Sequence, residues 1–351
     1  MNIKSLLLGS AAALAAVSGA QAADAIVAAA PEPAEYVRVC DAFGTGYFYI
    51  PGTETCLRVK GYVRFEVQGN SNDGDSSWSG SRDWNARTRG LVTFDAKNDS
   101  ELGTIGSTIT VRTWADENGG SLELDEAFIQ VAGFQVGSFY NYFDTGLSGE
   151  TDDLGSNRLN SIAYNYKSDA FFAGIAVDEL TGFYSRTRDL TTGLADPYGK
   201  NNRVGVEGQI GGSFGPVTAT LLGGWDAAAN DGAVRLLATA NVGPGVLGVA
   251  GLYSTGASAY YDKAEWTIAA EYAAKITDRL TLTPGVQYFA NTEITSTSGD
   301  YGGRDIWKGG LTLDYKLAEG LTTKVSAQYQ DHSWSNNDDV WSGFVRLQRS
   351  F

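Results

Sequence analysis

The sequence predicts an all-β protein, a sixteen-stranded antiparallel barrel that crosses a membrane, and three observations predict it. Apolar and polar residues alternate with a period of two along most of the chain after residue 57. The alternating segments are mostly 9–12 residues long, about the length that a tilted strand needs to cross a bilayer. Short and long connections between the segments alternate along the chain, as in barrels with short periplasmic turns and long extracellular loops.

The composition agrees with this fold class and excludes several functions. The 351 residues include 44 Gly, 18 Tyr, 15 Phe and 8 Trp, an excess that is typical of β structure with many turns. The net charge of −15 provides no basic surface for nucleic acid. One histidine, His332, and two cysteines leave little material for metal sites or histidine-based catalysis. We therefore expect no enzymatic activity, no cofactor and no metal.

Residues 1–22 are predicted to be a signal peptide. Lys4 gives the chain a positively charged amino-terminal region, and an apolar run follows over residues 6–17. A small-x-small motif ends at Ala22 and places the cleavage site between Ala22 and Ala23. The chain is therefore expected to be exported.

Residues 23–56 are expected to form a periplasmic linker and a disulfide segment. The linker is rich in Ala and Pro, which favours an extended chain. Cys40 and Cys56 are the only cysteines, and in an exported protein such a pair is most simply a disulfide. Closing a loop of this size contributes about 3 kcal/mol in the chain-entropy model.

Residues 57–351 are predicted to be the transmembrane barrel. An even strand number puts both termini in the periplasm. The fourth and fifth segments alternate least cleanly, and one interrupted strand is an alternative there. Tight turns are expected at sites such as Gly212-Ser213 and Gly243-Pro244. The sixteen predicted strands are 57–68, 84–97, 103–114, 122–131, 133–140, 159–167, 170–178, 201–211, 214–225, 232–242, 245–253, 264–274, 279–289, 305–315, 320–331 and 339–351.

Aromatic residues near the strand ends indicate the two membrane interfaces. They fall on the apolar faces of their strands, as the aromatic girdles of outer-membrane barrels do. The last strand ends on Phe351, like the carboxyl-terminal signature of such barrels. The aromatic residues in question are Trp225, Trp266, Tyr272, Tyr288, Trp307, Tyr315, Tyr329 and Trp341.

The sequence resembles the general porins of alphaproteobacteria. The resemblance is carried by 35–44, 48–59, 61–64, 127–134 and the terminal strand. It implies a homotrimeric barrel surrounded by outer-membrane lipid and lipopolysaccharide. Such a barrel passes small hydrophilic solutes and ions by passive diffusion. The resemblance also implies that the third long loop folds into the lumen.

Charged residues predict a narrow part of the pore. The strand parity places five arginines on the inner faces of the first, second, third and last strands, which are neighbours in a closed barrel. The third long connection, 141–158, carries four acidic residues that would face this arc if the loop folds inward. Opposed charges would create a transverse field that favours small dipolar solutes. The alternative is that the acids only solvate an outer loop. The arginines are Arg64, Arg87, Arg89, Arg112 and Arg346, and the acids are Asp144, Glu150, Asp152 and Asp153.

Two other functions stay open. His332-Ser333 suggests an outer-membrane barrel hydrolase, although two adjacent residues fall short of a nucleophile, base and orienter. A structural barrel that tethers the envelope is the other alternative. Separately, the Ala23-Asp24 start and the linker resemble those of alphaproteobacterial barrels that are attached to peptidoglycan through the new amino terminus, which is a hypothesis here beside an unattached spacer. Sixteen strands nevertheless leave an aqueous lumen, so a diffusion pore is the preferred interpretation.

Overall fold

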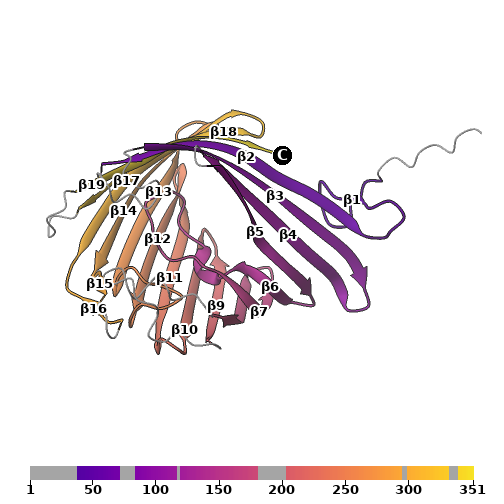
Figure 1. Ribbon diagram of the computed structural model, residues 1–351, viewed down its shortest axis with the longest axis horizontal. Helices are drawn as coiled ribbons and strands as arrows, with labels where there is room; N and C mark the ends of the chain where they lie inside the picture. Colours follow the sequence, from indigo (N-terminus) through magenta and orange to yellow (C-terminus); the bar gives the residue numbers. More distant parts are fainter. Residues whose placement is uncertain (1–37, 72–83, 117–118, 181–202, 295–298, 332–338) are drawn as a thin grey trace, which may run out of the picture. The chain divides into compact units, whose positions relative to one another are not determined.

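The computed structural model describes residues 38–71, 84–116, 119–180, 203–294, 299–331 and 339–351 (Figure 1). The chain divides into two compact units, Met1–Arg38 and Val39–Phe351, and every described strand belongs to the second. The predicted signal peptide, its cleavage site at Ala22 and Ala23, most of the linker and His332-Ser333 lie outside the described residues.

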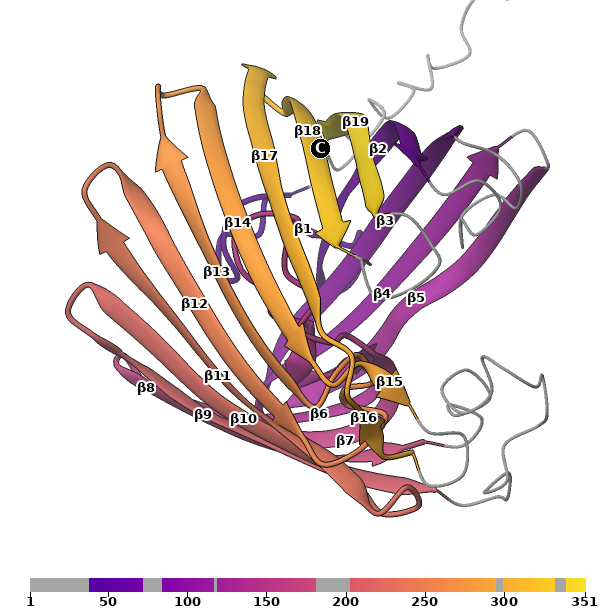
Figure 2. The ribbon, with the colours of Figure 1, turned by 90° about the vertical axis from the view of Figure 1, so that its left-hand side faces the viewer.

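The predicted sixteen-stranded antiparallel barrel is confirmed within these ranges. Each long strand pairs with two neighbours, and β19 closes the barrel against β2, with Arg346 opposite Glu66. Closure pairs each of the long described strands on both sides, so that none of them is an edge strand, and Figure 2 shows the tilted strands following one another. The strands are β2 (Cys56–Asn70), β3 (Trp84–Ser100), β4 (Gly103–Asp116), β5 (Gly119–Val131), β6 (Phe134–Tyr140), β7 (Arg158–Lys167), β8 (Phe171–Glu179), β9 (Val204–Phe214), β10 (Val217–Asp226), β11 (Asp231–Val242), β12 (Gly245–Ser254), β13 (Trp266–Lys275), β14 (Leu280–Ala290), β17 (Ile306–Ala318), β18 (Leu321–Asp331) and β19 (Val340–Ser350).

Apolar and polar side chains alternate along the strands between the outer and the inner face of the barrel, as predicted. In β2, Val63 and Phe65 are 52% and 47% exposed on the outer face, whereas Glu66 and Gln68 are 2% and 3% exposed on the inner face. Successive side chains of a strand point to opposite faces. The outer face is therefore apolar and the lumen polar. None of the described helices is long and apolar enough to span a membrane.

The fourth and fifth predicted segments are two strands, β5 and β6, rather than one interrupted strand. They are joined by a tight turn in which Ala132 and Gly133 have φ angles of 49° and 88°. The alternation of β5 is disturbed because the register against β4 shifts between Thr110 and Val111. This shift leaves Asp125 as the extra residue of a β-bulge, and a bulge breaks the period of two.

One predicted turn needs correction, and three short elements were not predicted. The turn between β9 and β10 lies at Gly215-Pro216, and Gly212 and Ser213 are paired within the sheet. Pro216 lacks an N–H group and suits a turn better than a ladder position. The elements that sequence analysis does not predict are the two-residue strands β1 (Phe48–Tyr49), β15 (Glu293–Ile294) and β16 (Tyr301–Gly302).

The predicted disulfide is confirmed. Cys40 and Cys56 are bonded, with Cα atoms 6.0 Å apart, and both are buried beside Tyr47. Cys56 begins β2 and pairs with Tyr49 of β1. The disulfide therefore fixes the amino-terminal segment to the first strand of the barrel.

Two loops fold into the barrel and fill part of its interior (Figure 1). Loop L3, residues 141–157, connects β6 to β7 and contains the short helix η1 (Tyr142–Asp144). Loop L6, residues 255–265, connects β12 to β13, and its Ala257, Tyr260 and Ala264 are fully buried. Phe143 of L3 and Tyr260 of L6 pack in one apolar cluster with Leu222, Leu252 and other inward residues of β10–β14. The inward-folded third loop is thus confirmed.

Candidate functional site

Glu271 on β13 anchors the tip of L3. Its carboxylate accepts hydrogen bonds from the backbone N–H groups of Gly149, of Thr151 at 3.0 Å and of Asp152 at 3.2 Å. Glu271 is 2% exposed. Buried backbone groups require partners, and one carboxylate here serves three of them.

Further anchors hold the rest of L3 to the inner wall. Arg235 on β11 donates to the carbonyl oxygens of Phe143 at 2.8 Å and Leu154 at 3.1 Å. Glu207 on β9 accepts the N–H of Tyr142 at 3.1 Å. Gln287 on β14 accepts the N–H of Asp153 at 2.7 Å and donates back to its carbonyl oxygen at 3.1 Å. L3 is therefore attached along the strands β9 to β14.

Loop L6 packs against the side of L3 that faces β8–β14. The Tyr260 ring packs on Phe143 with centroids 5.7 Å apart, and its hydroxyl donates to Asp178 on β8 at 2.6 Å. The side-chain amide of Asn157 donates to the carbonyl oxygen of Ala259. This packing leaves L3 in contact with protein on the side that faces β8–β14.

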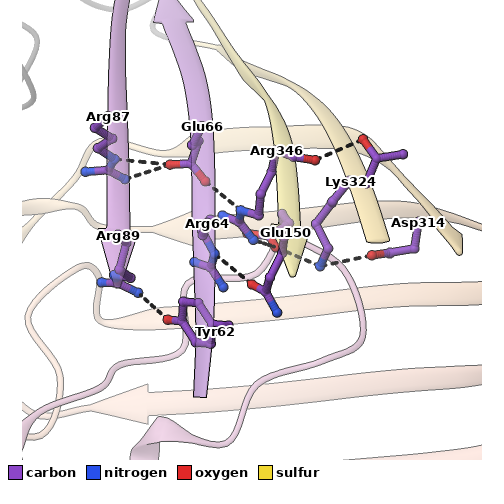
Figure 3. A network of polar contacts seen from close by, with 11 residues as sticks. Tyr62, Arg64, Glu66, Arg87, Arg89, Glu150, Asp314, Lys324 and Arg346 are labelled. Carbon is purple, nitrogen blue, oxygen red and sulfur yellow. Dashed lines mark hydrogen bonds and ion pairs between the residues drawn. The ribbon is translucent and has the colours of Figure 1, made fainter. Parts of the chain in front are cut away.

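A chain of alternating charges links L3 to the opposite part of the wall (Figure 3). Glu150 of L3 lies 2.9 Å from Lys324 and 3.4 Å from Arg346. Glu66 binds Arg346 at 2.6 Å and Arg87 at 2.8 Å. Lys324 also lies 3.5 Å from Asp314. We call this set, Asp314, Lys324, Glu150, Arg346, Glu66 and Arg87, the ion-pair chain.

Arg64 and Arg89 lie directly opposite each other on β2 and β3, two residues closer to the turn end of the barrel. The Nε of Arg64 donates to Gln348 at 2.9 Å, and Arg89 donates to the Tyr62 hydroxyl at 3.3 Å. Arg89 also stacks on Trp114, with its guanidinium carbon 3.9 Å from the ring centroid. Within the described part of the chain, neither guanidinium has a carboxylate partner. We call Arg64 and Arg89 the arginine pair.

The fifth predicted arginine, Arg112 on β4, lies in a separate cluster. It contacts Glu123 at 2.5 Å and Asp125 at 3.0 Å. Tyr140 bridges Arg112 and Asp125 through its hydroxyl. The structure therefore brings four of the five predicted arginines together around Glu66 and places the fifth beside two acids of β5.

The four predicted acids of L3 have different surroundings. Glu150 alone makes ion pairs with the predicted arc. Asp144 is exposed and accepts a hydrogen bond from Ser156 within the loop. The backbone of Asp153 is bound to Gln287.

Asp152 is turned back toward its own loop. Its Oδ2 accepts the N–H of Leu147 at 3.1 Å. Burial, together with the nearby Glu271 carboxylate, raises the pKa of Asp152 to about 6. Its charge therefore changes in the range of mildly acidic solutions.

Several residues of the site were missed by sequence reasoning. Glu66 and Lys324 lie on inward positions of strands already assigned, so parity alone was sufficient to find them. Glu207, Arg235 and Glu271 carry another signal, because each is a charged residue at a mid-strand inward position whose inward neighbours, two residues before and after it, are uncharged. No group of three potential metal ligands occurs among the described residues.

Comparisons with known proteins agree with this architecture. The family model described as "Porin subfamily" matches residues 24–346. Outer membrane protein IIIA of Rhizobium leguminosarum bv. viciae is 48% identical, with 98% of this chain and 93% of that protein covered. Porin Omp2a of Brucella suis biovar 1 is 33% identical over the whole of both chains. The crystal structure of the outer membrane channel DcaP of Acinetobacter baumannii has a TM-score of 0.67 at 14% identity, covering 86% of this chain and 99% of that one.

The last of these comparisons concerns the fold alone, since its sequence identity is low. The family model and the first relative each span nearly the whole chain. They support an outer-membrane channel and favour neither the hydrolase nor the envelope-tethering barrel. The chain therefore belongs to the porin subfamily of outer-membrane proteins.

Proposed function

We propose that the chain forms a water-filled channel through which small hydrophilic solutes and ions diffuse passively. The observation that carries the proposal is the attachment of L3 inside a closed barrel, from Glu271 on one side to Arg346 on the other. A sixteen-stranded barrel encloses an aqueous lumen, and an inner loop attached to its wall narrows that lumen.

The constriction in this proposal lies between L3 and the inner wall of β2–β4 and β19. Its basic side is formed by Arg64, Arg87, Arg89, Arg112 and Arg346, and its acidic side by Asp144, Glu150, Asp152 and Asp153. Glu150 supports the assignment most directly, because it reaches the arginine arc. Opposed charges in a narrow, low-dielectric passage orient water and dipolar solutes.

Planar bilayer recordings test this function. Purified full-length protein should give stepwise conductance in KCl without any added substrate. Protein that is folded but gives no conductance steps would overturn the proposal.

We further propose a homotrimer in outer-membrane lipid and lipopolysaccharide. A structural neighbour, OmpT of Vibrio cholerae, is described in a trimer form and supports the trimer, and the exposed apolar outer face supports the lipid contact. Attachment to peptidoglycan through Ala23 is a separate proposal. Mass spectrometry of lysozyme-treated sacculi should find a muropeptide on a peptide that begins at Ala23, and an unmodified peptide would contradict it.

We also propose that the protein has no hydrolase activity. An acyl-transfer site needs a nucleophile, a base and an orienting group, and His332-Ser333 supplies two adjacent residues at most. Purified protein should not hydrolyse ester substrates, and turnover that is lost in Ser333→Ala would contradict this proposal.

A further inference from the structure

The inner wall of β2, β3 and β19 has two levels with different charge balance (Figure 3). At the level of Glu66, every arginine is close to a carboxylate, and the ion-pair chain alternates in sign. At the level of Arg64, the cross-strand partner is Arg89 on one side and the neutral Gln348 on the other. Positive charge is therefore concentrated at the second level.

Two like charges directly opposite on neighbouring strands are destabilising. No ion pair among the described residues offsets that cost at this level, because the arginine pair is hydrogen-bonded to neutral groups, the Gln348 amide and the Tyr62 hydroxyl. Trp114 adds a cation–π contact to Arg89. These neutral partners orient the guanidinium groups, whereas the nearest acids, Glu66 for Arg64 and Glu123 for Arg89, act on them at longer range without an ion pair among the described residues.

The donors of the arginine pair are largely unused. A guanidinium has five N–H donors in a planar fork, and each arginine of the pair donates one described hydrogen bond. The Nε of Arg89 is buried and has no hydrogen-bond partner among the described residues. A solute does not reach this buried atom, but Arg64 and Arg89 are each only half-buried, so their remaining guanidinium N–H groups are the donors that a solute can meet.

The fork geometry selects the chemical class of the ligand. Guanidinium groups bind carboxylate and phosphate oxygens in a bidentate manner with charge-assisted hydrogen bonds. A neutral solute offers no charge to the pair, and a cation is repelled by it. The ion-pair chain is a poor competitor for an anion because Glu66 and Glu150 already occupy its cations.

We propose that Arg64 and Arg89 form a binding subsite for small oxyanions, carboxylates or phosphates, inside the channel. The inference rests on the proposed channel function. It names the class of solute that binds transiently while it diffuses through the channel. A solute bound there lies beside Tyr62, Trp114 and Gln348, the residues that hold the pair in place.

Block of single-channel current tests the subsite. Full-length protein is recorded in planar bilayers at low KCl while succinate, inorganic phosphate or glycerol is added. We expect succinate or phosphate to reduce the wild-type current in a saturable way, and glycerol to have no such effect. Whichever of the two anions blocks at the lower concentration identifies the preferred oxyanion, carboxylate or phosphate.

The variants Arg89→Gln and Arg64→Gln should each raise the half-blocking concentration about tenfold, the order expected for one hydrogen bond to a charged group. Arg89→Lys keeps the charge and loses the fork, so it should weaken block while leaving the reversal potential near that of wild type. Arg349→Gln removes one positive charge at the turn end, outside the subsite, and should leave block unchanged. Heat-modifiable migration on gels verifies folding, and Arg64→Gln replaces Arg89→Gln if the latter does not assemble.

The outcomes separate the two proposals. Equal half-blocking concentrations in wild type and in folded Arg89→Gln or Arg64→Gln channels would overturn the subsite while the channel function stands. Equal loss of block in Arg349→Gln would also overturn it, because a general field would then account for the effect. Folded wild-type protein without conductance would overturn the channel and the subsite together.

Discussion

The two sides of the lumen use their inward residues in different ways. Along β10–β13 these residues are mainly small or apolar, such as Ala233, Ala250 and Ala269, and L3 and L6 pack against them. Along β2, β3 and β19 they are long and charged or polar, such as Arg89 and Arg346. We call the first region the filled side and the second the arginine wall.

The difference shows how one barrel provides both a support and a passage. Small inward side chains leave room for a loop, and a few buried charges satisfy the backbone of that loop. Along the arginine wall, long charged side chains pair with one another instead, as Arg87 and Arg346 do with the buried Glu66, and no described loop packs over them in the way that L3 and L6 cover the filled side. The filled side therefore holds L3 in place, and in the proposed channel the arginine wall lines the passage that L3 leaves open.

The largest expected effect comes from removing the main anchor on the filled side. Glu271→Ala deletes the acceptor of three backbone N–H groups of L3. Hydrogen bonds to charged groups contribute about 1.5–3 kcal/mol each, so the tip of L3 should detach. Single-channel recordings should show larger conductance and more current noise than wild type.

Glu271→Gln is the control for this prediction. It keeps the shape of the side chain and one acceptor oxygen, and its effect should be smaller. Unchanged conductance and noise in folded Glu271→Ala channels would show that the other anchors suffice, contrary to the role given to Glu271.

A smaller effect separates the arginine pair from the ion-pair chain. Arg64→Gln with Arg89→Gln removes two positive charges and should shift the reversal potential toward cation preference. Glu66→Gln with Arg87→Gln removes a bound pair of opposite charges and should shift it little. The Coulomb energy between two unit charges ~4 Å apart is ~1 kcal/mol in bulk water, so each removed charge should change the energy of a passing ion by an amount of this order.

Salt should weaken this difference, because the screening length falls from ~10 Å at 0.1 M to ~3 Å at 1 M. Reversal potentials in dilute and in concentrated KCl gradients measure it. Similar shifts for the two double variants would mean that the two levels of the wall contribute alike.

The smallest expected effect is a pH step from L3. Asp152 has a pKa of about 6 because it is buried near the Glu271 carboxylate. Lowering the pH from 7 to 5 neutralises it, removes one negative charge from L3 and should shift selectivity toward anions. Asp152→Asn should show anion-shifted selectivity at pH 7 and no step near pH 6. A step of wild-type size in this variant would assign the titration to another group.

Strand parity predicted the arginine wall well because its geometry is local. Side chains two residues apart share a face, and closure of the barrel places β19 beside β2. These two rules bring Arg64, Arg89 and Arg346 together without knowledge of any loop. The same rules cover Glu66, whose role follows only when its neighbours Arg87 and Arg346 are considered as a set.

The surroundings of the L3 acids could not be predicted in this way. A loop has no fixed period, so its side-chain directions depend on its anchors. The register of L3 follows from contacts more than a hundred residues apart in sequence, such as Thr151 with Glu271. The acids were consequently expected to act as one group, whereas only Glu150 makes ion pairs with the arc and Asp152 turns back to Leu147.

The most direct test of the filled side against the arginine wall is thiol accessibility from water. The described cysteines are both in the disulfide, so an introduced thiol can be modified selectively. Arg89→Cys lies on the wall, and Ala250→Cys lies on the filled side, where Ala250 is 1% exposed. During single-channel recording, a small anionic thiosulfonate should reduce the current of Arg89→Cys in steps and leave Ala250→Cys unchanged. Equally fast block of both variants, or block of Ala250→Cys alone, would contradict a pore that runs along the arginine wall.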